Sequence, residues 1–294
     1  MEAATYRSAR EDDLYAAARI HAVARNDMLT RNGRTTPPDD LEGDAKNFRH
    51  VLHTGIFEVA EQDGRVAAVC NAVVRDGIWF LSSFWVLPEL QNQHIGGPLL
   101  RRVWRLGEAA GARIFCVWAS VDNTAMATYF KLGMLPGTQL LNFAGDAGKL
   151  VLPETPGQYK TRPLAVAEAA AIDRAIRGTP RAVDHRFWLA DETRQGRLVL
   201  KDGDPCGYYY TTPQGAVLPA AWLDPADGEA VLSLACRDGV ARGGAAALRL
   251  PGYNHLGIGF ALRAGMTLRG FSHFLTTASF GRLDQYAASG PLLF

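Results

Sequence analysis

Residues 91–97 have the residue types of an anion-binding turn. The segment is polar, ends in two glycines and precedes Pro98, a residue tolerated in the first turn of a helix. The first N–H groups of a helix have no partner within it and lie at the positive end of its dipole. The backbone N–H groups from Gln93 to Gly97 are therefore expected to bind a pyrophosphate. The alternative is a plain strand-to-helix turn with incidental glycines.

The elements expected around this turn would hold it at the end of a sheet. Three β-rich runs are separated by Asp63-Gly64 and Asp76-Gly77, which are strong signals for tight hairpins. The predicted elements are a strand over 6–9, a helix over 11–24, strands over 56–61, 66–74 and 78–86, a helix over 95–110, a strand over 114–119, a helix over 124–132 and a strand over 139–143. This order predicts a mixed α/β fold, an α+β arrangement on a mixed sheet.

A second series of elements follows residues 146–162, which contain Pro, Gly and Lys without periodicity. The series comprises a helix over 165–177, strands near Leu198, Tyr208 and Val217, a helix from Glu229, a strand over 245–250 and a short helix after Asn254. A constant offset also aligns Gly133-Met134 with Gly265-Met266. We predict a duplicated fold, with a first domain at 1–146, a linker at 147–162 and a second domain at 163–294.

The composition is that of a globular protein without a strong overall field. Lys and Arg number 31 against 30 Asp and Glu, which argues against a nucleic-acid partner. The sequence opens without a basic and then apolar leader, and no apolar run approaches the ~20 residues that span a bilayer. We expect a cytoplasmic protein without a membrane partner. The four cysteines are widely spaced in apolar settings, which predicts buried free thiols and no metal site.

Residues 85–100 resemble motif A of the GNAT superfamily of N-acetyltransferases. In that motif Val-x-Pro is followed by Gln/Arg-x-x-Gly-x-Gly and then Leu-Leu, and Gln91, Gly96 and Leu99-Leu100 match it. His94 stands where a glycine is usual. A residue other than glycine is tolerated there if its φ is negative and its side chain points outward.

Residues 122–134 resemble motif B of the same superfamily, with Tyr129 four residues before Gly133. Asp122 falls on the usual Asn position, and Asn123 is one step along. Both motifs occur in the order that the family has. The resemblance covers roughly residues 5–145 well and the remainder in outline. It implies tandem GNAT domains.

The resemblance implies acetyl-CoA as the cosubstrate and gives roles to particular residues. Backbone groups of Trp85 and Val86 would pair with the pantetheine arm like an added strand. The phenol of Tyr129, with an ordinary pKa of about 10, would protonate the departing thiolate; a hydrogen-bonded core tyrosine is the alternative. The implied coenzyme-binding residues are Trp85, Val86, Gln91, Asn92, Gln93, His94, Ile95, Gly96, Gly97 and Asn123.

A base for the amine proton is harder to identify, because the strand at 78–86 lacks the carboxylate that many relatives place there. Ser83 would hold a relay water. The apolar end of the chain suggests a docked terminus, so the carboxylate of Phe294 is a second candidate, with packing alone as the alternative. Glu58 and His94 are further candidates. The acidic run at 39–44 is expected to cap a helix, or else to attract a cationic amine.

The second series lacks the residues of the first site. At the constant offset Gln91 becomes Leu223, Tyr129 becomes Ala261, and Asp227 places negative charge where a phosphate would lie. We therefore expect the first domain alone to move an acetyl group from acetyl-CoA to a primary amine of a small molecule, by direct transfer in a ternary complex. The alternative is a non-catalytic acyl-CoA-binding sensor or scaffold. A homodimer is left open.

Overall fold

The computed structural model describes residues 4–294, so residues 1–3, at the start of the expected first domain, lie outside it. The chain forms two compact units. The first unit comprises residues up to 117 together with 122–134 and 291–293, and the second comprises 118–121, 135–290 and 294. Residues 135–146 thus group with the second unit, although they precede the expected linker. The division at 1–146, 147–162 and 163–294 stays a prediction about the duplicated sequence.

The first unit is built on an antiparallel meander with one parallel strand beside it. Its strands lie in the order β1 (Thr5–Ser8), β2 (Ile56–Gln62), β3 (Arg65–Arg75), β4 (Ile78–Val86) and β5 (Ile114–Ala119). Asp63 and Gly64 both have positive φ, at 50° and 73°, as a two-residue hairpin turn requires. The predicted meander is therefore confirmed, because β2 pairs with β3 and β3 with β4 in antiparallel register.

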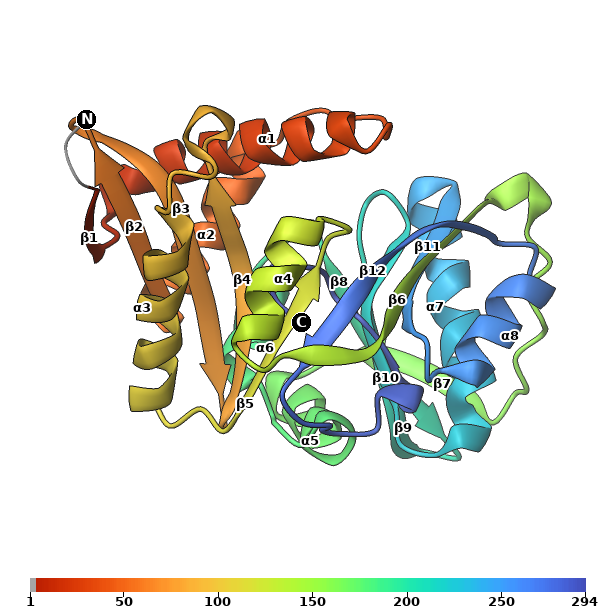
Figure 1. The fold of residues 1–294 in the computed structure, drawn as a ribbon. Coiled ribbons are helices and arrows are strands. Elements are labelled where there is room, and N and C mark those ends of the chain that lie inside the picture. The colour runs from red at the N-terminus through yellow and green to blue at the C-terminus, as the bar shows by residue number, and fades with distance from the viewer. Residues whose placement is uncertain (1–3) are drawn as a thin grey trace. The chain divides into compact units, whose positions relative to one another are not determined.

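Helices cover both faces of this sheet (Figure 1). They are α1 (Leu14–Arg31), α2 (Leu41–Thr54), α3 (Gly96–Ala109) and α4 (Asn123–Lys131). On one face Arg102 of α3 contacts Glu58 of β2. On the other face Phe48 of α2 packs against Phe57, whose side chain points away from that of Glu58 because successive strand residues alternate. The expected helix at 11–24 is correct in type but extends to Arg31.

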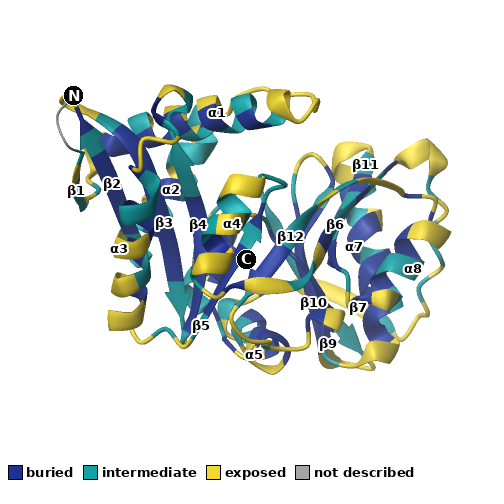
Figure 2. Cartoon of the chain, viewed as in Figure 1, coloured by how far each residue is buried: buried dark blue, intermediate teal, exposed yellow. Residues whose placement is uncertain are grey.

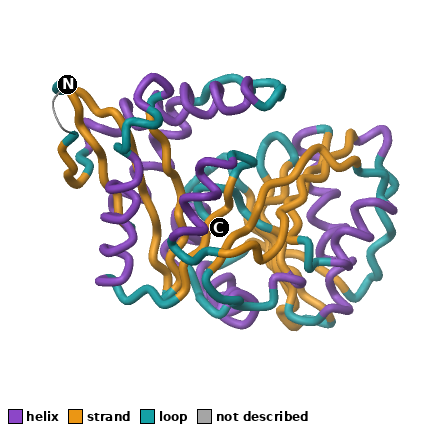
Figure 3. Tube along the Cα trace, in the orientation of Figure 1, coloured by secondary structure: helices purple, strands orange, loops and turns teal. Residues whose placement is uncertain are grey.

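The second unit repeats this order of elements, which confirms the predicted mixed α/β class. Its strands are β6 (Leu135–Asp146), β7 (Tyr159–Pro163), β8 (Gln195–Lys201), β9 (Asp204–Thr211), β10 (Ala216–Trp222), β11 (Ala245–Pro251), β12 (Thr267–Thr276) and β13 (Tyr286–Ala287). Its helices are α5 (Val166–Arg177), α6 (Ala182–Leu189), α7 (Gly228–Gly243) and α8 (His255–Arg263). Figure 3 shows these helices in purple beside the orange strands. The end of the expected linker and the residue after it, 159–163, form the edge strand β7, which pairs with β8.

Strand β6 has a position that its place in the sequence does not indicate. Within the second unit the order is β12-β6-β11-β10-β9-β8-β7, and β13 pairs with β10. Strand β6 is antiparallel to β11 on one side, from Ala245↔Asp146 to Pro251↔Leu140, and to β12 on the other. A segment that precedes the second series of elements thus forms an interior strand of its sheet.

Each unit has its own apolar core. Figure 2 shows the strands largely buried and the outer sides of the helices exposed. Cys70, Cys116, Cys206 and Cys236 are buried free thiols, as expected. Across residues 4–294, no helix is both long enough and apolar enough to cross a bilayer.

Candidate functional site

Half of strand β4 has one free edge. The parallel pairing of β4 with β5 runs from Ile78↔Ile114 to Leu81↔Val117 and has no further register pair among the described residues. On its other side β4 stays paired with β3 as far as Val86↔Ala68. The backbone from Ser82 to Val86 therefore presents one edge without a strand partner, which can hydrogen-bond an extended ligand as an added strand would.

A bulge marks the point where this free edge begins. Asn71 pairs with Ser83 and Ala72 with Leu81, so Ser82 is an extra residue on β4. A bulge of this kind bends and twists its strand and commonly lies beside an active site. The predicted residues Trp85 and Val86 lie beyond it, on the free half of the strand.

Two glutamine side chains of the predicted turn after β4 donate hydrogen bonds to backbone carbonyls nearby. The side chain of Gln91 donates to the Val86 carbonyl at 3.2 Å, and that of Gln93 donates to the Glu89 carbonyl at 3.0 Å. The Val86 carbonyl thus has a partner inside the turn. The condition placed on His94 is not met, because its φ is +60°, and Asn92 has a φ of +65°. Asn and His are among the residues that adopt this region most readily, so the turn forms without glycine there.

Helix α3 begins beside this turn with its first N–H groups uncapped. Ile95 precedes the helix and its side chain makes no cap, and no acidic residue lies in the first turn. Gly96 is needed for packing, because a Cβ on it would lie 2.9 Å from Cζ of Phe84 and 3.2 Å from Cγ2 of Val86. A Cβ on Gly97 would meet only the Arg101 guanidinium, at 3.5 Å. The helix start therefore lies directly against the free half of β4.

These two glycines give a paired prediction. Gly96→Ala should lower the free energy of unfolding by about 1 to 3 kcal/mol, because the methyl group overpacks the contact with Phe84. Gly97→Ala should be neutral or stabilising, because alanine favours helix by up to about 1 kcal/mol over glycine. Urea unfolding of both variants measures the difference, and equal effects would show that the close approach at Gly96 is unimportant.

Tyr129 is buried on α4, on the same side of β4 as α3. It is 6% exposed, and its ring centroid lies 6.5 Å from that of Phe84, the side chain that also faces Gly96. Burial raises the pKa of its phenol above the ordinary value, and Cys70 and Asp122 add to the effect. The hydroxyl makes no hydrogen bond within residues 4–294. Tyr129 therefore stays protonated at neutral pH, as a proton donor requires.

The start of α4 is fixed by Asp122 rather than by Asn123. A side-chain oxygen of Asp122 accepts from the Ala125 backbone N–H at 2.9 Å and so caps the helix. Asn123 is the first helical residue and is exposed. The other Asp122 oxygen lies 3.8 Å from the Arg31 guanidinium at the end of α1. Helix α1 thus reaches from the meander to the start of α4.

The candidate bases occupy different environments. Glu58 is buried and accepts from Ser8 at 2.7 Å and from Arg102 at 2.5 Å, so both of its oxygens are engaged. His94 is exposed on the turn. Phe294 belongs to the second unit, where its main-chain oxygen accepts from Arg177 at 2.7 Å. Both carboxylate oxygens of Glu58 therefore have a donor already, and one oxygen of Phe294 has a charged donor.

Ser83 retains an unused hydroxyl. It is 4% exposed and lies opposite Asn71 in the register of β3 and β4. The Ser83 hydroxyl and both polar atoms of the Asn71 side chain have no hydrogen-bond partner within residues 4–294. Because buried polar groups in proteins are nearly always satisfied, this pair fits one or more ordered waters. That supports the relay-water role expected for Ser83.

The acidic run at 39–44 serves several local contacts. Asp40 caps α2 by accepting from the Gly43 N–H at 2.9 Å, which confirms the capping expectation for that residue. Asp39 accepts from Arg25 at 2.9 Å. Asp44 contacts Nδ1 of His21 at 2.7 Å. His21 was missed by sequence reasoning, because its partner lies on another helix and no local spacing signals the pair.

The second unit fills its own counterpart of the free edge. There β10 pairs in parallel with β11 only at the start, and farther along it pairs with β13 instead. The pairs are Ala216↔Ala247 and Val217↔Leu248 with β11, then Ala220↔Ala287 and Ala221↔Tyr286 with β13. The N–H of Ala288 also donates to the Arg249 carbonyl of β11 at 2.7 Å. The chain itself therefore occupies the edge that β4 leaves open.

The start of α7 also differs from that of α3. Asp227 directly precedes the helix and is 4% exposed. One of its oxygens accepts from Lys201 and from Tyr159, each at 2.8 Å. A carboxylate with its own cation stands where the first unit leaves an uncapped helix start, so an incoming phosphate would meet negative charge.

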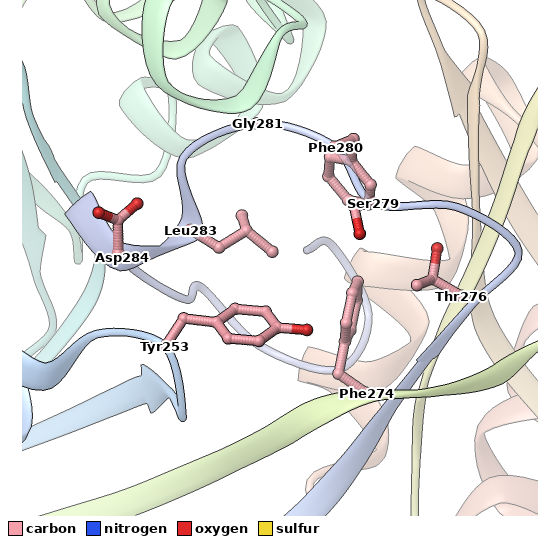
Figure 4. A pocket seen from close by; sticks show the side chains of 8 residues that line it. All are labelled: Tyr253, Phe274, Thr276, Ser279, Phe280, Gly281, Leu283 and Asp284. Carbon is pink, nitrogen blue, oxygen red and sulfur yellow. The ribbon is translucent and has the colours of Figure 1, made fainter.

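A pocket of about 210 Å³ lies in the second unit (Figure 4), and two of its lining rings, those of Phe274 and Phe280, contact the ring of Phe294. It is lined by Tyr253, Phe274, Thr276, Ser279, Phe280, Gly281, Leu283 and Asp284. The rings of Phe274 and Phe280 face its interior, and the Tyr253 hydroxyl donates to the Gly137 carbonyl. The volume is below the range of about 300 to 1,000 Å³ usual for small-molecule sites, so we assign no ligand to it.

Comparisons with known proteins agree with the fold. Residues 22–134 match the model of the acetyltransferase (GNAT) family. A putative acetyltransferase from Pyrococcus horikoshii is similar over 100% of this chain and 97% of its own, with TM-score 0.79 and 15% identity. A GCN5-related N-acetyltransferase from Sphaerobacter thermophilus is similar over 93% and 95%, with TM-score 0.66 and 15% identity.

A tandem GNAT protein from the clavulanic acid biosynthesis pathway is similar over 93% of this chain and 98% of its own, with TM-score 0.61 and 15% identity. Among curated proteins, none matches the sequence significantly. At these identities the solved structures support the fold, and the family model supports the activity of the segment that carries the turn and Tyr129. Residues 22–134, which carry the turn and Tyr129, therefore belong to the acetyltransferase (GNAT) family, and the whole chain has the fold of tandem GNAT proteins.

Proposed function

We propose that the first unit moves an acetyl group from acetyl-CoA to a primary amine of a small molecule, by direct transfer in a ternary complex. The family uses acyl-CoA donors, and the acetyl group and the amine are our assignment. The observation that carries the proposal is the free half of β4 next to the uncapped start of α3. A coenzyme arm can pair with that edge while its pyrophosphate lies at the helix start.

The residues around this edge divide the chemistry between them. The amine nitrogen would form a bond to the thioester carbonyl carbon while the carbon–sulfur bond breaks. Tyr129, kept protonated by burial, would give its proton to the departing sulfur. Water held by Ser83 and Asn71 would carry the amine proton away. Neither proton step requires a covalent enzyme intermediate.

The second unit is proposed to bind no coenzyme. Strand β13 occupies the edge of β10, and Asp227 with Lys201 occupies the start of α7. Its contribution would be structural. The non-catalytic sensor remains the alternative for the whole chain, and it differs in one measurable respect, because a sensor binds acetyl-CoA without releasing thiol when amines are added.

Coenzyme binding gives the direct test. Titration calorimetry of the full chain with acetyl-CoA should give one site per chain. Gly97→Glu should abolish that site by placing a carboxylate at the start of α3, where space is available for it. Gly97→Ala is the matched control and should bind as the unchanged protein does. Two equivalent sites, or undiminished binding by Gly97→Glu, would contradict the proposal.

A further inference from the structure

His21 and Asp44 form a hydrogen-bonded pair between α1 and α2. Nδ1 of His21 lies 2.7 Å from Oδ2 of Asp44, and the two side chains are 13% and 14% exposed. An ionised carboxylate can only accept a hydrogen bond, so Nδ1 carries the proton of the neutral ring. Nε2 then holds the free lone pair. The pair thus has the arrangement of a histidine oriented for proton transfer.

Nε2 of His21 is available to a ligand. It has no hydrogen-bond partner within residues 4–294. It is also not one of the fully enclosed polar atoms that lack a partner, so it keeps some contact with solvent. The ring is held by aromatic neighbours instead, with centroids 5.3 Å from Trp85 and 5.9 Å from Phe48.

The contact with Trp85 places this pair at the free half of β4. Phe84 and Trp85 are consecutive strand residues, so their side chains lie on opposite faces of the sheet. Phe84 faces Gly96 and Tyr129, whereas Trp85 faces His21. Ser83, with its unused hydroxyl, lies on the face of Trp85. The free edge therefore has Tyr129 on one face and His21 on the other.

We infer that His21, oriented by Asp44, is the general base of the transfer. The acceptor amine would approach the thioester from the α1 face and give one proton to Nε2, directly or through the Ser83 water. Tyr129 would give its own proton to the sulfur on the opposite face. The proton lost by the amine thus goes to His21, and the thiolate receives its proton from Tyr129. Asp44 is a positioning residue. The inference rests on the proposed function.

The charged groups near His21 are Arg25 on α1 and Asp44 on α2, and Arg25 is paired with another residue. On α1, Arg25 is one turn along and is paired with Asp39 at 2.9 Å. On α2 the group in contact is Asp44 itself. On β4 the side chain in contact is the uncharged Trp85. The Asp44 carboxylate is thus the charged side chain in direct contact with the imidazole.

Chemical rescue tests the inference. The assay uses acetyl-CoA with ethylamine, putrescine or benzylamine and detects the released thiol. His21→Ala should lower kcat about 10²-fold or more, since general-base catalysis typically contributes 10² to 10⁴. Added imidazole should restore part of that rate by entering the space beside Trp85 and Phe48. Coenzyme affinity, measured by calorimetry, should be unchanged.

Two further variants keep the test decisive. His53→Ala removes an exposed histidine of α2 that pairs with Glu11, and should keep full activity and show no effect of imidazole. If His21→Ala does not fold, His21→Gln keeps a donor for Asp44 but no base, and should show the same loss of kcat. A variant that folds and binds acetyl-CoA but keeps the unchanged rate, or a lost rate that imidazole cannot restore, overturns the inference. If the unchanged protein releases no thiol with any of these amines, the proposed function itself is wrong.

Discussion

Replacing Tyr129 by Phe should lower kcat about 10²-fold or more while leaving the affinity for acetyl-CoA nearly unchanged. The reason is that the substitution removes one hydroxyl hydrogen-bond donor and keeps the buried ring beside Phe84. General-acid catalysis typically contributes 10² to 10⁴ to a rate, and a group that acts on the leaving thiolate contributes little to ground-state binding. Steady-state kinetics with thiol detection and calorimetry together measure both quantities.

A control substitution shows whether loss of a tyrosine hydroxyl elsewhere in the protein would lower the rate as well. Tyr15 on α1 is 60% exposed, and Tyr15→Phe should change neither kcat nor affinity. The raised pKa of Tyr129 adds a qualitative expectation, because a phenol that stays protonated through neutral and mildly alkaline pH gives no loss of donor function in that range. An unchanged rate of thiol release in Tyr129→Phe would make it a core tyrosine only.

Asp173→Asn should destabilise the second unit by about 3 to 5 kcal/mol. Asp173 is fully buried and contacts Arg181 at 2.7 Å and His185 at 2.9 Å. The amide would leave the buried Arg181 guanidinium without its counter-ion, and that uncompensated charge is the main cost. Glu168→Gln is the control, because its pair with Arg162 lies on the surface and should contribute less than about 1 kcal/mol. Urea unfolding compares the two, and similar small effects would contradict the argument.

The same cluster makes stability depend on pH. Burial lowers the pKa of His185 below 6.5, against the opposing effect of Asp173. Burial opposes ionisation of Asp173, but Arg181, His185 and Arg177 outweigh it and hold its pKa below 3.8. As the pH decreases, each group takes up its proton in the unfolded chain at a higher pH than in the folded protein. The free energy of unfolding therefore falls as the pH decreases below 6.5. Thermal unfolding at pH 7 and pH 5 should show this fall, and His185→Gln should reduce it.

The sequence predicted the features that depend on local pattern. The Asp-Gly pairs at 63–64 and 76–77 determined the meander, and the helical spacing after residue 95 determined α3. The repeated order of elements could be recognised because each element carries its own periodicity. The strand at 159–163 was not predicted, because an exposed edge strand has little apolar alternation to reveal it.

The features that could not be predicted are those that join distant parts of the chain. Nothing in the spacing of His21 and Asp44 links two helices, and the two-residue strand β13 is too short to carry a pattern. The sequence showed that the second copy lacked Gln and Tyr, but not that residues 286–287 fill its edge. The positive φ of His94 was likewise set by the turn as a whole rather than by its residue type.

The interior position of β6 has a consequence for synthesis on the ribosome. Strand β6 ends at Asp146, whereas its two neighbours begin at Ala245 and Thr267. At about 5 to 20 residues per second, the growing chain would hold this strand without either neighbour for roughly 5 to 20 seconds. During that interval its N–H and C=O groups are open to pairing with another nascent chain. We therefore expect the nascent polypeptide to depend on rapid completion or on a chaperone, although in the finished sheet β6 pairs with a strand on each side.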